Sequence, residues 1–167
     1  MAAAGSDARM NGCELPVVIT SGSGNQGITA SVPVVVYAHA LAAGEEKMLR
    51  AVLLSDLVTI YLKQGIGKLS AYCGAVSAGC AAGCGIAYLQ GADLKAVSHT
   101  LVNALAIVSG IICDGAKASC AAKIASSVEA GILGYRHVQK RPAVPQWGMA
   151  SSQRALKIPS VMWTAGP

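Results

Sequence analysis

Apolar residues recur along most of the chain at the spacing of α-helices, and strand-like alternation is confined to short runs. The clearest helical pattern lies between Gly44 and Gly65. Its apolar positions are Leu49, Val52, Leu53, Leu57, Ile60 and Tyr61. Two glutamates open this segment and Lys63 lies near its end, a charge distribution that complements the helix dipole.

Further helices are predicted over about 28–42, 69–89, 93–109 and 115–133, and the Ala-rich start of the chain also has helical character. Proline is tolerated only in the first turn of a helix, so Pro33 favours a start near residue 31 for the first of these. The sequence therefore predicts an all-α or mostly α fold.

Composition indicates how these helices pack. The 167 residues suffice for one domain with its own core. Of these residues 53% are hydrophobic, yet there are 19 Gly and no Phe, so the apolar mass consists of small side chains. Such helices can approach one another closely, and we expect a compact bundle of small-residue-rich helices.

Residues 71–89 form an uncharged stretch of 19 residues, the length of a membrane span. The stretch is mostly Ala, Gly, Ser and Cys and gains little from lipid, so a helix buried in protein is favoured. A small-residue helical membrane protein or packing module remains the non-catalytic alternative.

The distribution of charged residues argues against nucleic acid as a partner. The net charge is +5, but before Arg136 eight Lys and Arg balance eight Asp and Glu. A basic stripe interleaved with aromatic residues is absent. The first 16 residues lack the features of a signal peptide, and the six cysteines then point to a reducing, cytoplasmic location.

The segment "SGSGNQG", residues 21–27, matches the G-x-G-x-x-G pattern of dinucleotide-binding loops. A dinucleotide site needs a second strand ending in an acidic residue, whereas Glu45 and Glu46 open a helix. The loop instead offers a dense set of donors before a helix, which suits a small anion such as a carboxylate. These donors are Ser21, Ser23, Asn25, Gln26 and backbone N–H groups. A helix-capping turn without a ligand is the alternative.

The cysteines leave two interpretations open from spacing alone. Cys80 and Cys84 lie four residues apart on one predicted helix, where small buried thiols filling an Ala-like site are commoner than chelating pairs. Cys113 and Cys120 flank a loop and a helix start, the usual setting for iron–sulfur ligands. Zinc-ribbon spacings are absent, which argues against zinc.

Three long segments resemble the C-terminal region of the L-cysteine desulfidase family, whose members are related to the alpha subunit of iron–sulfur L-serine dehydratases. The segments are "NGCELPVVITSGSGNQGITASVPVVVYA", "GIGKLSAYCGAVSAGCAAGCGIAYL" and "HTLVNALAIVSGIICDGAKASCAAKIASSVEAGILGY". The resemblance extends from about residue 1 to Tyr135.

The resemblance implies a [4Fe-4S] cluster held by three cysteines, with one iron free for substrate. The family spacing of 40 and then 7 residues is that of Cys73, Cys113 and Cys120, which are therefore the expected ligands. Cys80 and Cys84 become packing residues, and Cys13 is left unassigned.

The implied reaction converts L-cysteine to pyruvate, ammonia and hydrogen sulfide without pyridoxal phosphate, with L-serine as the alternative substrate. A small amino acid is thus the expected partner, and a homodimer of the full-length form is left open. The substrate carboxylate is expected at the opening loop. Its candidate binding residues are Ser21, Gly22, Ser23, Gly24 and Asn25.

Family members are longer at the N-terminus, where a catalytic cysteine is proposed, so we expect residues 1–135 to be the C-terminal part of a serine dehydratase alpha-like domain. Residues 136–167 lose the Ala/Gly pattern and hold four of the six Pro. The segment "GMASSQRALKIPSVM" can be back-translated so that, read two bases later, it spells "DGIVTKGVENTIRNV", which resembles the family continuation. We therefore interpret this segment as an aberrant, frameshifted and disordered tail.

Overall fold

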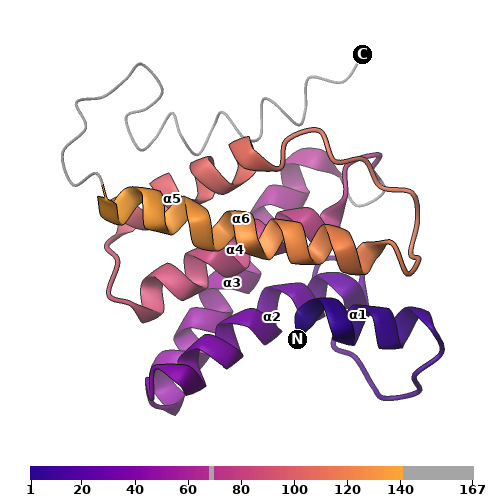
Figure 1. The fold of residues 1–167 in the computed structure, drawn as a ribbon, viewed down its shortest axis with the longest axis horizontal. Helices are drawn as coiled ribbons and strands as arrows, with labels where there is room; N and C mark the ends of the chain where they lie inside the picture. Colours follow the sequence, from indigo (N-terminus) through magenta and orange to yellow (C-terminus); the bar gives the residue numbers. More distant parts are fainter. Residues whose placement is uncertain (68–69, 141–167) are drawn as a thin grey trace.

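The computed structural model describes residues 1–67 and 70–140, and helices account for its regular structure (Figure 1). The helices of this described part are α1 (Ala2–Met10), α2 (Gly24–Ala40), α3 (Glu45–Ile66), α4 (Gly74–Leu89), α5 (Leu94–Ile107) and α6 (Cys120–Lys140). Across the described residues β-structure is limited to two isolated bridges, Thr20 with Ser23 and Tyr72 with Ile112. The predicted all-α class is therefore confirmed.

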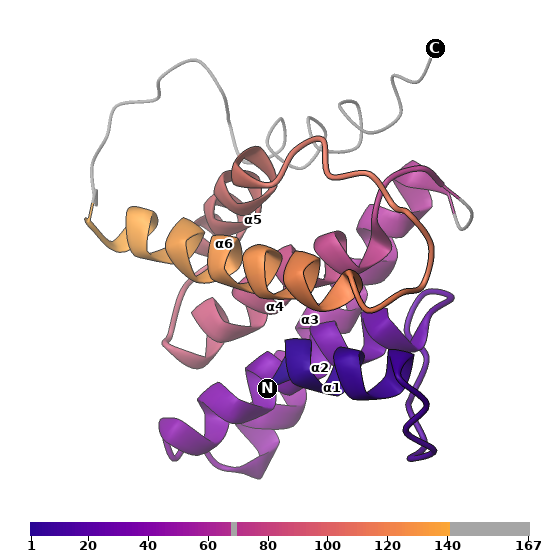
Figure 2. The same ribbon diagram turned by 45° about the vertical axis from the view of Figure 1, so that its right-hand side comes forward.

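Helix α4 lies at the centre of the bundle. It packs against α2, α3, α5 and α6, while α1 lies against α6 and α2. In both views α6 crosses in front of α4 (Figures 1 and 2). Every residue of α4 except Tyr88 is buried, although the helix holds only three large aliphatic side chains. Its small residues bury the backbone itself, as the composition predicts.

The contact between α4 and α6 is made by small residues. A Cβ built on Gly83 would lie 2.5 Å from the Cα of Gly131, and one built on Gly79 would lie 2.0 Å from the Ser127 hydroxyl. Only residues without larger side chains permit this approach. Residue 79 meets residue 127 and residue 83 meets residue 131, so residue numbers increase in the same direction along α4 and α6. The two helices are therefore parallel where they cross. Both helices therefore begin at the same end of the bundle.

The start of α2 differs from the prediction, since the helix begins at Gly24 and Pro33 lies in its interior. A proline removes one helical hydrogen bond and disturbs the carbonyls of the preceding turn. Here the buried Ser55 hydroxyl of α3 donates a hydrogen bond to the Ala30 carbonyl at 2.7 Å. A contact between helices therefore helps this turn to tolerate the proline, which local sequence could not indicate.

The starts of α4 and α6 also lie later than predicted. Residues 70–73 are not helical, because Tyr72 pairs with Ile112, and α6 begins at Cys120 after turns rather than at residue 115. Helix α6 continues to Lys140, so residues 136–140 of the expected tail extend a helix. Residues 141–167, which carry the rest of the tail interpretation, lie outside the described residues.

Helix α4 does not have the character of a membrane span. Within the described ranges, no helix combines the length and the apolar character needed to cross a bilayer. The uncharged stretch at 71–89 is instead enclosed by neighbouring helices.

The helix crossing predicts a strong dependence on glycine at position 83. Gly83→Ala should lower the free energy of unfolding by about 1–3 kcal/mol, because its methyl group meets the backbone of α6. Urea denaturation of the chain measures this change. The matched control is Gly5→Ala in α1, whose methyl group would lie an ordinary 3.5 Å from Ile28, and which should be neutral or stabilising. Equal stability of the two variants would contradict the close crossing.

Candidate functional site

Two of the three predicted cluster ligands are joined by backbone pairing. The Cys73 N–H donates to the Ile111 carbonyl at 3.3 Å, and the Cys113 N–H donates to the Ala71 carbonyl at 2.6 Å. These bonds flank the bridge between Tyr72 and Ile112. Residues 40 positions apart in the sequence are thus held side by side, just before α4 begins.

Cys73 occupies the position before the first turn of α4 and is buried. Burial raises the pKa of its thiol, whereas hydrogen bonds from the N–H groups of Val76 and Ala75 lower it. Negative charge on Cys113 raises the Cys73 pKa further, and the Lys123 ammonium lowers it. The start of α4 therefore supplies donors suited to a thiolate, while burial keeps the free thiol neutral.

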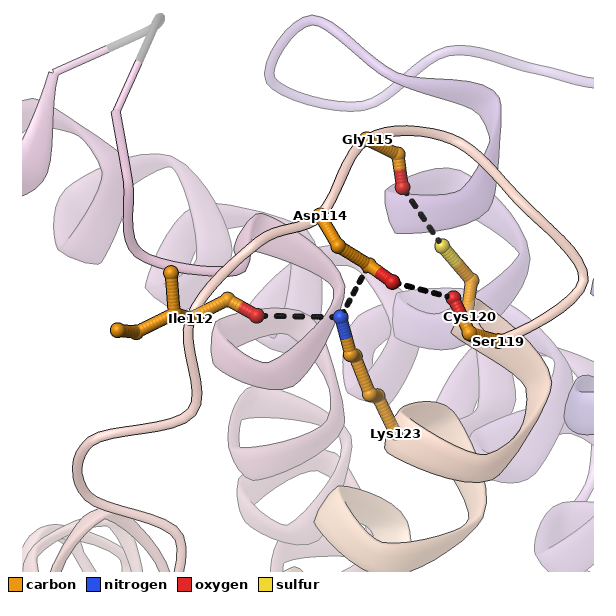
Figure 3. Close-up of polar contacts among 6 residues, drawn as sticks. All are labelled: Ile112, Asp114, Gly115, Ser119, Cys120 and Lys123. Atoms are coloured by element: carbon orange, nitrogen blue, oxygen red, sulfur yellow. Dashed lines mark hydrogen bonds and ion pairs between the residues drawn. The ribbon is translucent and has the colours of Figure 1, made fainter.

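Cys120, the third predicted ligand, is the first residue of α6, and the Cys113 loop is attached to the same helix start (Figure 3). The Lys123 ammonium donates to the Ile112 carbonyl at 3.1 Å and also pairs with the Asp114 carboxylate. Ser119 donates to the same carboxylate at 2.9 Å. These two donors lower the Asp114 pKa to about 2, so the carboxylate stays charged.

Lys63 is a site residue that the sequence pattern did not identify. It was predicted only as a charge at the end of a helix, but its side chain is buried with 5% of the residue exposed. Burial lowers its pKa, and negative charge on Cys113 and Cys73 raises it. In the described part of the chain its ammonium has no hydrogen-bond partner. Together with Lys123 it places two cations within electrostatic range of the cysteines.

The three predicted ligands come from three segments around one end of the bundle. Cys73 and Cys120 lie at helix starts and Cys113 lies in a loop. Cysteine thiolates are the usual ligands of iron–sulfur clusters. Among residues 1–67 and 70–140, no group of three His, Cys, Asp or Glu side chains is close enough to hold a single metal ion.

The other cysteines lie away from this arrangement. Cys80 and Cys84 are completely buried within α4, and burial raises the pKa of both thiols, that of Cys84 to about 12. The Cys84 sulfur lies 3.8 Å from the carbonyl oxygens of Cys80 and Val97. Both are therefore packing residues, as expected, and Cys13 is exposed.

The glycine pattern of residues 21–27 has a steric explanation. Ser21 and Gly22 adopt positive φ angles of 54° and 103° in the turn before α2. A Cβ on Gly27 would lie 1.9 Å from the Val18 carbonyl oxygen, so only glycine fits there. The Ser23 side chain does not cap the start of α2.

Within the expected carboxylate loop, Ser21 and Ser23 are half-buried, Gly22 is exposed, and Gly24 and Asn25 are buried. The Asn25 side chain is already engaged, since its carbonyl oxygen accepts a hydrogen bond from Arg9 at 3.0 Å. A Cβ on Gly24 would lie 3.0 Å from the Arg9 guanidinium. Arg9 thus brings a positive charge to this loop, a role the sequence pattern did not indicate because the contact spans 16 residues.

Gln26 connects the loop with the cysteines. Its side chain lies against Gly74, where an added Cβ would meet the amide carbon and nitrogen at 2.7 Å. Gly74 directly follows Cys73, so the starts of α2 and α4 meet at this contact. The structure therefore brings the predicted carboxylate loop next to one predicted cluster ligand.

Comparison with known proteins identifies the family of the chain. A family model described as "Serine dehydratase alpha chain" matches residues 1–153, and the chain belongs to this family. No solved structure matches the chain.

Several curated relatives are named UPF0597 proteins. The one from Desulfitobacterium hafniense is 67% identical over 135 residues, which are 81% of this chain and 31% of the relative. Those from Lachnoclostridium phytofermentans and Finegoldia magna are 62% and 58% identical, over 80% of this chain and 32% of each relative. The chain thus spans about a third of the length of the curated relatives it matches.

Removal of the Lys123 ammonium should loosen the Cys113 loop. The Asp114 side chain is exposed and its ion pair with Lys123 is a weak surface contact, so Lys123→Met should speed alkylation of Cys113 by no more than about fivefold. Peptide mass spectrometry of a time course measures the rate. Lys117→Met, at an exposed lysine of the same loop, is the control. An unchanged rate in Lys123→Met would show that the loop is held by other contacts.

Burial predicts the order in which the thiols react. In the native apoprotein at mildly alkaline pH, exposed Cys13 should be alkylated first. Cys80 and Cys84 should stay unmodified until the chain unfolds, because their raised pKa values keep them neutral and their burial excludes reagent. Quantifying all six cysteines by mass spectrometry tests this order. Rapid labelling of Cys80 or Cys84 under native conditions would contradict the packing of α4.

Proposed function

We propose that the chain is part of a [4Fe-4S]-dependent lyase that degrades L-cysteine to pyruvate, ammonia and hydrogen sulfide. The observation that carries this proposal is the arrangement of Cys73, Cys113 and Cys120 around one end of the bundle. Membership of the serine dehydratase alpha chain family supports the class of reaction. L-Serine, which would lose its β-hydroxyl rather than its thiol, is the alternative substrate.

In this proposal Cys73, Cys113 and Cys120 hold the cluster as thiolates. Three thiolates concentrate negative charge, which the neighbouring cations Lys63 and Lys123 offset. The N–H groups of Ala75 and Val76 act in the same sense on Cys73. A cluster with three protein ligands supplies one iron with an open position, a Lewis acid suited to the leaving group of the substrate.

The start of α2 is the proposed binding site of the substrate carboxylate. Its residues Ser21, Gly22, Ser23, Gly24 and Asn25 present helix-start N–H groups and hydroxyls. Such groups bind anions, and the positive end of the helix dipole adds to the attraction. Arg9 reinforces the positive charge and orients Asn25. The contact between Gln26, which directly follows this loop, and Gly74 supports a position of the carboxylate near Cys73.

We propose that the remaining catalytic residues belong to the part of the longer relatives that this chain does not cover. Because the chain spans about a third of its relatives, we assign the base that removes the α-proton to the remaining part of the longer proteins. Loss of the proton and of the β-substituent gives an aminoacrylate, whose hydrolysis yields pyruvate and ammonia. A cluster of this kind also suits a reducing compartment, and we propose the cytoplasm.

Anaerobic reconstitution with iron and sulfide tests the ligand assignment. The chain should take up iron and become brown, and Cys73→Ser, Cys113→Ser and Cys120→Ser should each lose most of the visible absorption and bound iron. Cys80→Ser is the control, since it changes a buried thiol that packs inside α4. Equal cluster loss in all four variants would refute the assignment. Because the proposed base lies in the remaining part of the longer proteins, sulfide release from L-cysteine and pyruvate formation from L-serine are compared on a full-length relative, which distinguishes the two substrates.

A further inference from the structure

The carbonyl oxygen of the Gln26 side chain is buried and has no hydrogen-bond partner among residues 1–67 and 70–140. Only 5% of the residue is exposed. A buried acceptor without a partner is destabilising, and native structures rarely retain one without a reason. The position of this oxygen provides such a reason.

We propose that Gln26 is a specificity-determining residue whose Oε1 accepts a hydrogen bond from the α-ammonium group of the amino-acid substrate. This inference rests on the proposed function and identifies how the same site recognises the second charged group of its substrate. An α-amino acid carries a carboxylate, which only accepts hydrogen bonds, and an ammonium group, which only donates them. A site that binds both groups needs hydrogen-bond donors and at least one acceptor close together.

The start of α2 supplies donors, but its other side-chain amide is occupied. The Asn25 carbonyl oxygen is taken by Arg9. The nearby side chains of Arg9, Lys63 and Lys123 are cations and cannot accept. The nearby carboxylates already accept hydrogen bonds, Asp56 from Thr20 and Asp114 from Ser119 and Lys123. Gln26 Oε1 is therefore a buried acceptor without a partner among the described residues, in a region rich in positive charge. An uncharged acceptor also avoids placing a second carboxylate next to the substrate's own.

The side chain of Gln26 is held in place. It extends from the first turn of α2 to the first residue of α4, where Gly74 leaves room for its amide group. Any larger residue at position 74 would displace it. This contact holds the amide group of Gln26 between the start of α2 and the residue that follows Cys73. In this proposal the α-ammonium group of the substrate lies there.

Pairs of ligands that differ only in the α-amino group test the assignment on the full chain. L-Cysteine is compared with 3-mercaptopropionate, and L-serine with 3-hydroxypropionate, by calorimetric titration of the anaerobically reconstituted protein. Gln26→Met should weaken binding of the amino acids by about 10- to 100-fold, the loss expected for a hydrogen bond to a charged donor, and leave the desamino analogues unchanged. Gln26→Glu, which keeps an acceptor, should retain the preference for amino acids. Gln90→Met, at an exposed glutamine after α4, is the control.

Stability of the unliganded protein supplies a readout that does not involve the cluster. Because Oε1 is unpaired, Gln26→Met should raise the melting temperature by about 2–4 °C, whereas a glutamine that serves packing should lose stability when replaced. Equal weakening of both ligands in a pair, or a lower melting temperature, would overturn the inference. If the chain binds the cluster but Gln26→Met leaves every affinity unchanged, the inference alone fails. If the wild-type chain does not assemble a cluster, the proposed function fails, and the melting temperatures still decide the role of Gln26.

Discussion

The close crossing of α4 and α6 is the constraint on which the candidate site depends. Gly83 and Gly131 bring the two backbones into contact, and the helices run in the same direction at that point. Cys73 lies ten residues before Gly83, and Cys120 lies eleven residues before Gly131. Since helices rise about 1.5 Å per residue, both cysteines lie at comparable heights at one end of the bundle. Packing in the core thus sets the separation of two proposed ligands.

The surroundings of these cysteines are suited to negative charge. The starts of α2 and α4 meet at Gln26 and Gly74, and α6 begins beside the Cys113 loop. Helix starts carry partial positive charge, and the buried Lys63 and the half-buried Lys123 add full charges. A set of thiolates and a substrate carboxylate would both be stabilised there. One electrostatic arrangement would therefore serve both the cofactor and the substrate.

Much of the fold could be predicted from the sequence because its determinants are local. Helical periodicity and the abundance of Ala and Gly indicate a tightly packed helical bundle. Both features can be recognised within short segments of the sequence. The start of α2 was misplaced because a hydroxyl from another helix, that of Ser55, bonds to the turn that Pro33 disturbs. The start of α4 was misplaced because Tyr72 pairs with a segment 40 residues away.

The candidate site was predictable only in part. Spacing alone left the cysteines ambiguous, and it was the family resemblance that selected Cys73, Cys113 and Cys120. Arg9 was not selected, Gln26 was identified only as one donor of the loop, and Lys63 only as a charge at the end of a helix. Their other roles arise from contacts between helices distant in sequence. The G-x-G-x-x-G pattern, by contrast, suggests a nucleotide site by itself. In the structure Gly27 is explained by its close packing on Val18.

The most direct test of the central claim is an anomalous-scattering map, recorded at the iron edge, from crystals of the anaerobically reconstituted chain. The account predicts one compact iron peak bordered by the sulfur atoms of Cys73, Cys113 and Cys120, at the end of the bundle where α2, α4 and α6 begin. Iron bound instead at Cys13, or at Cys80 and Cys84, would contradict it.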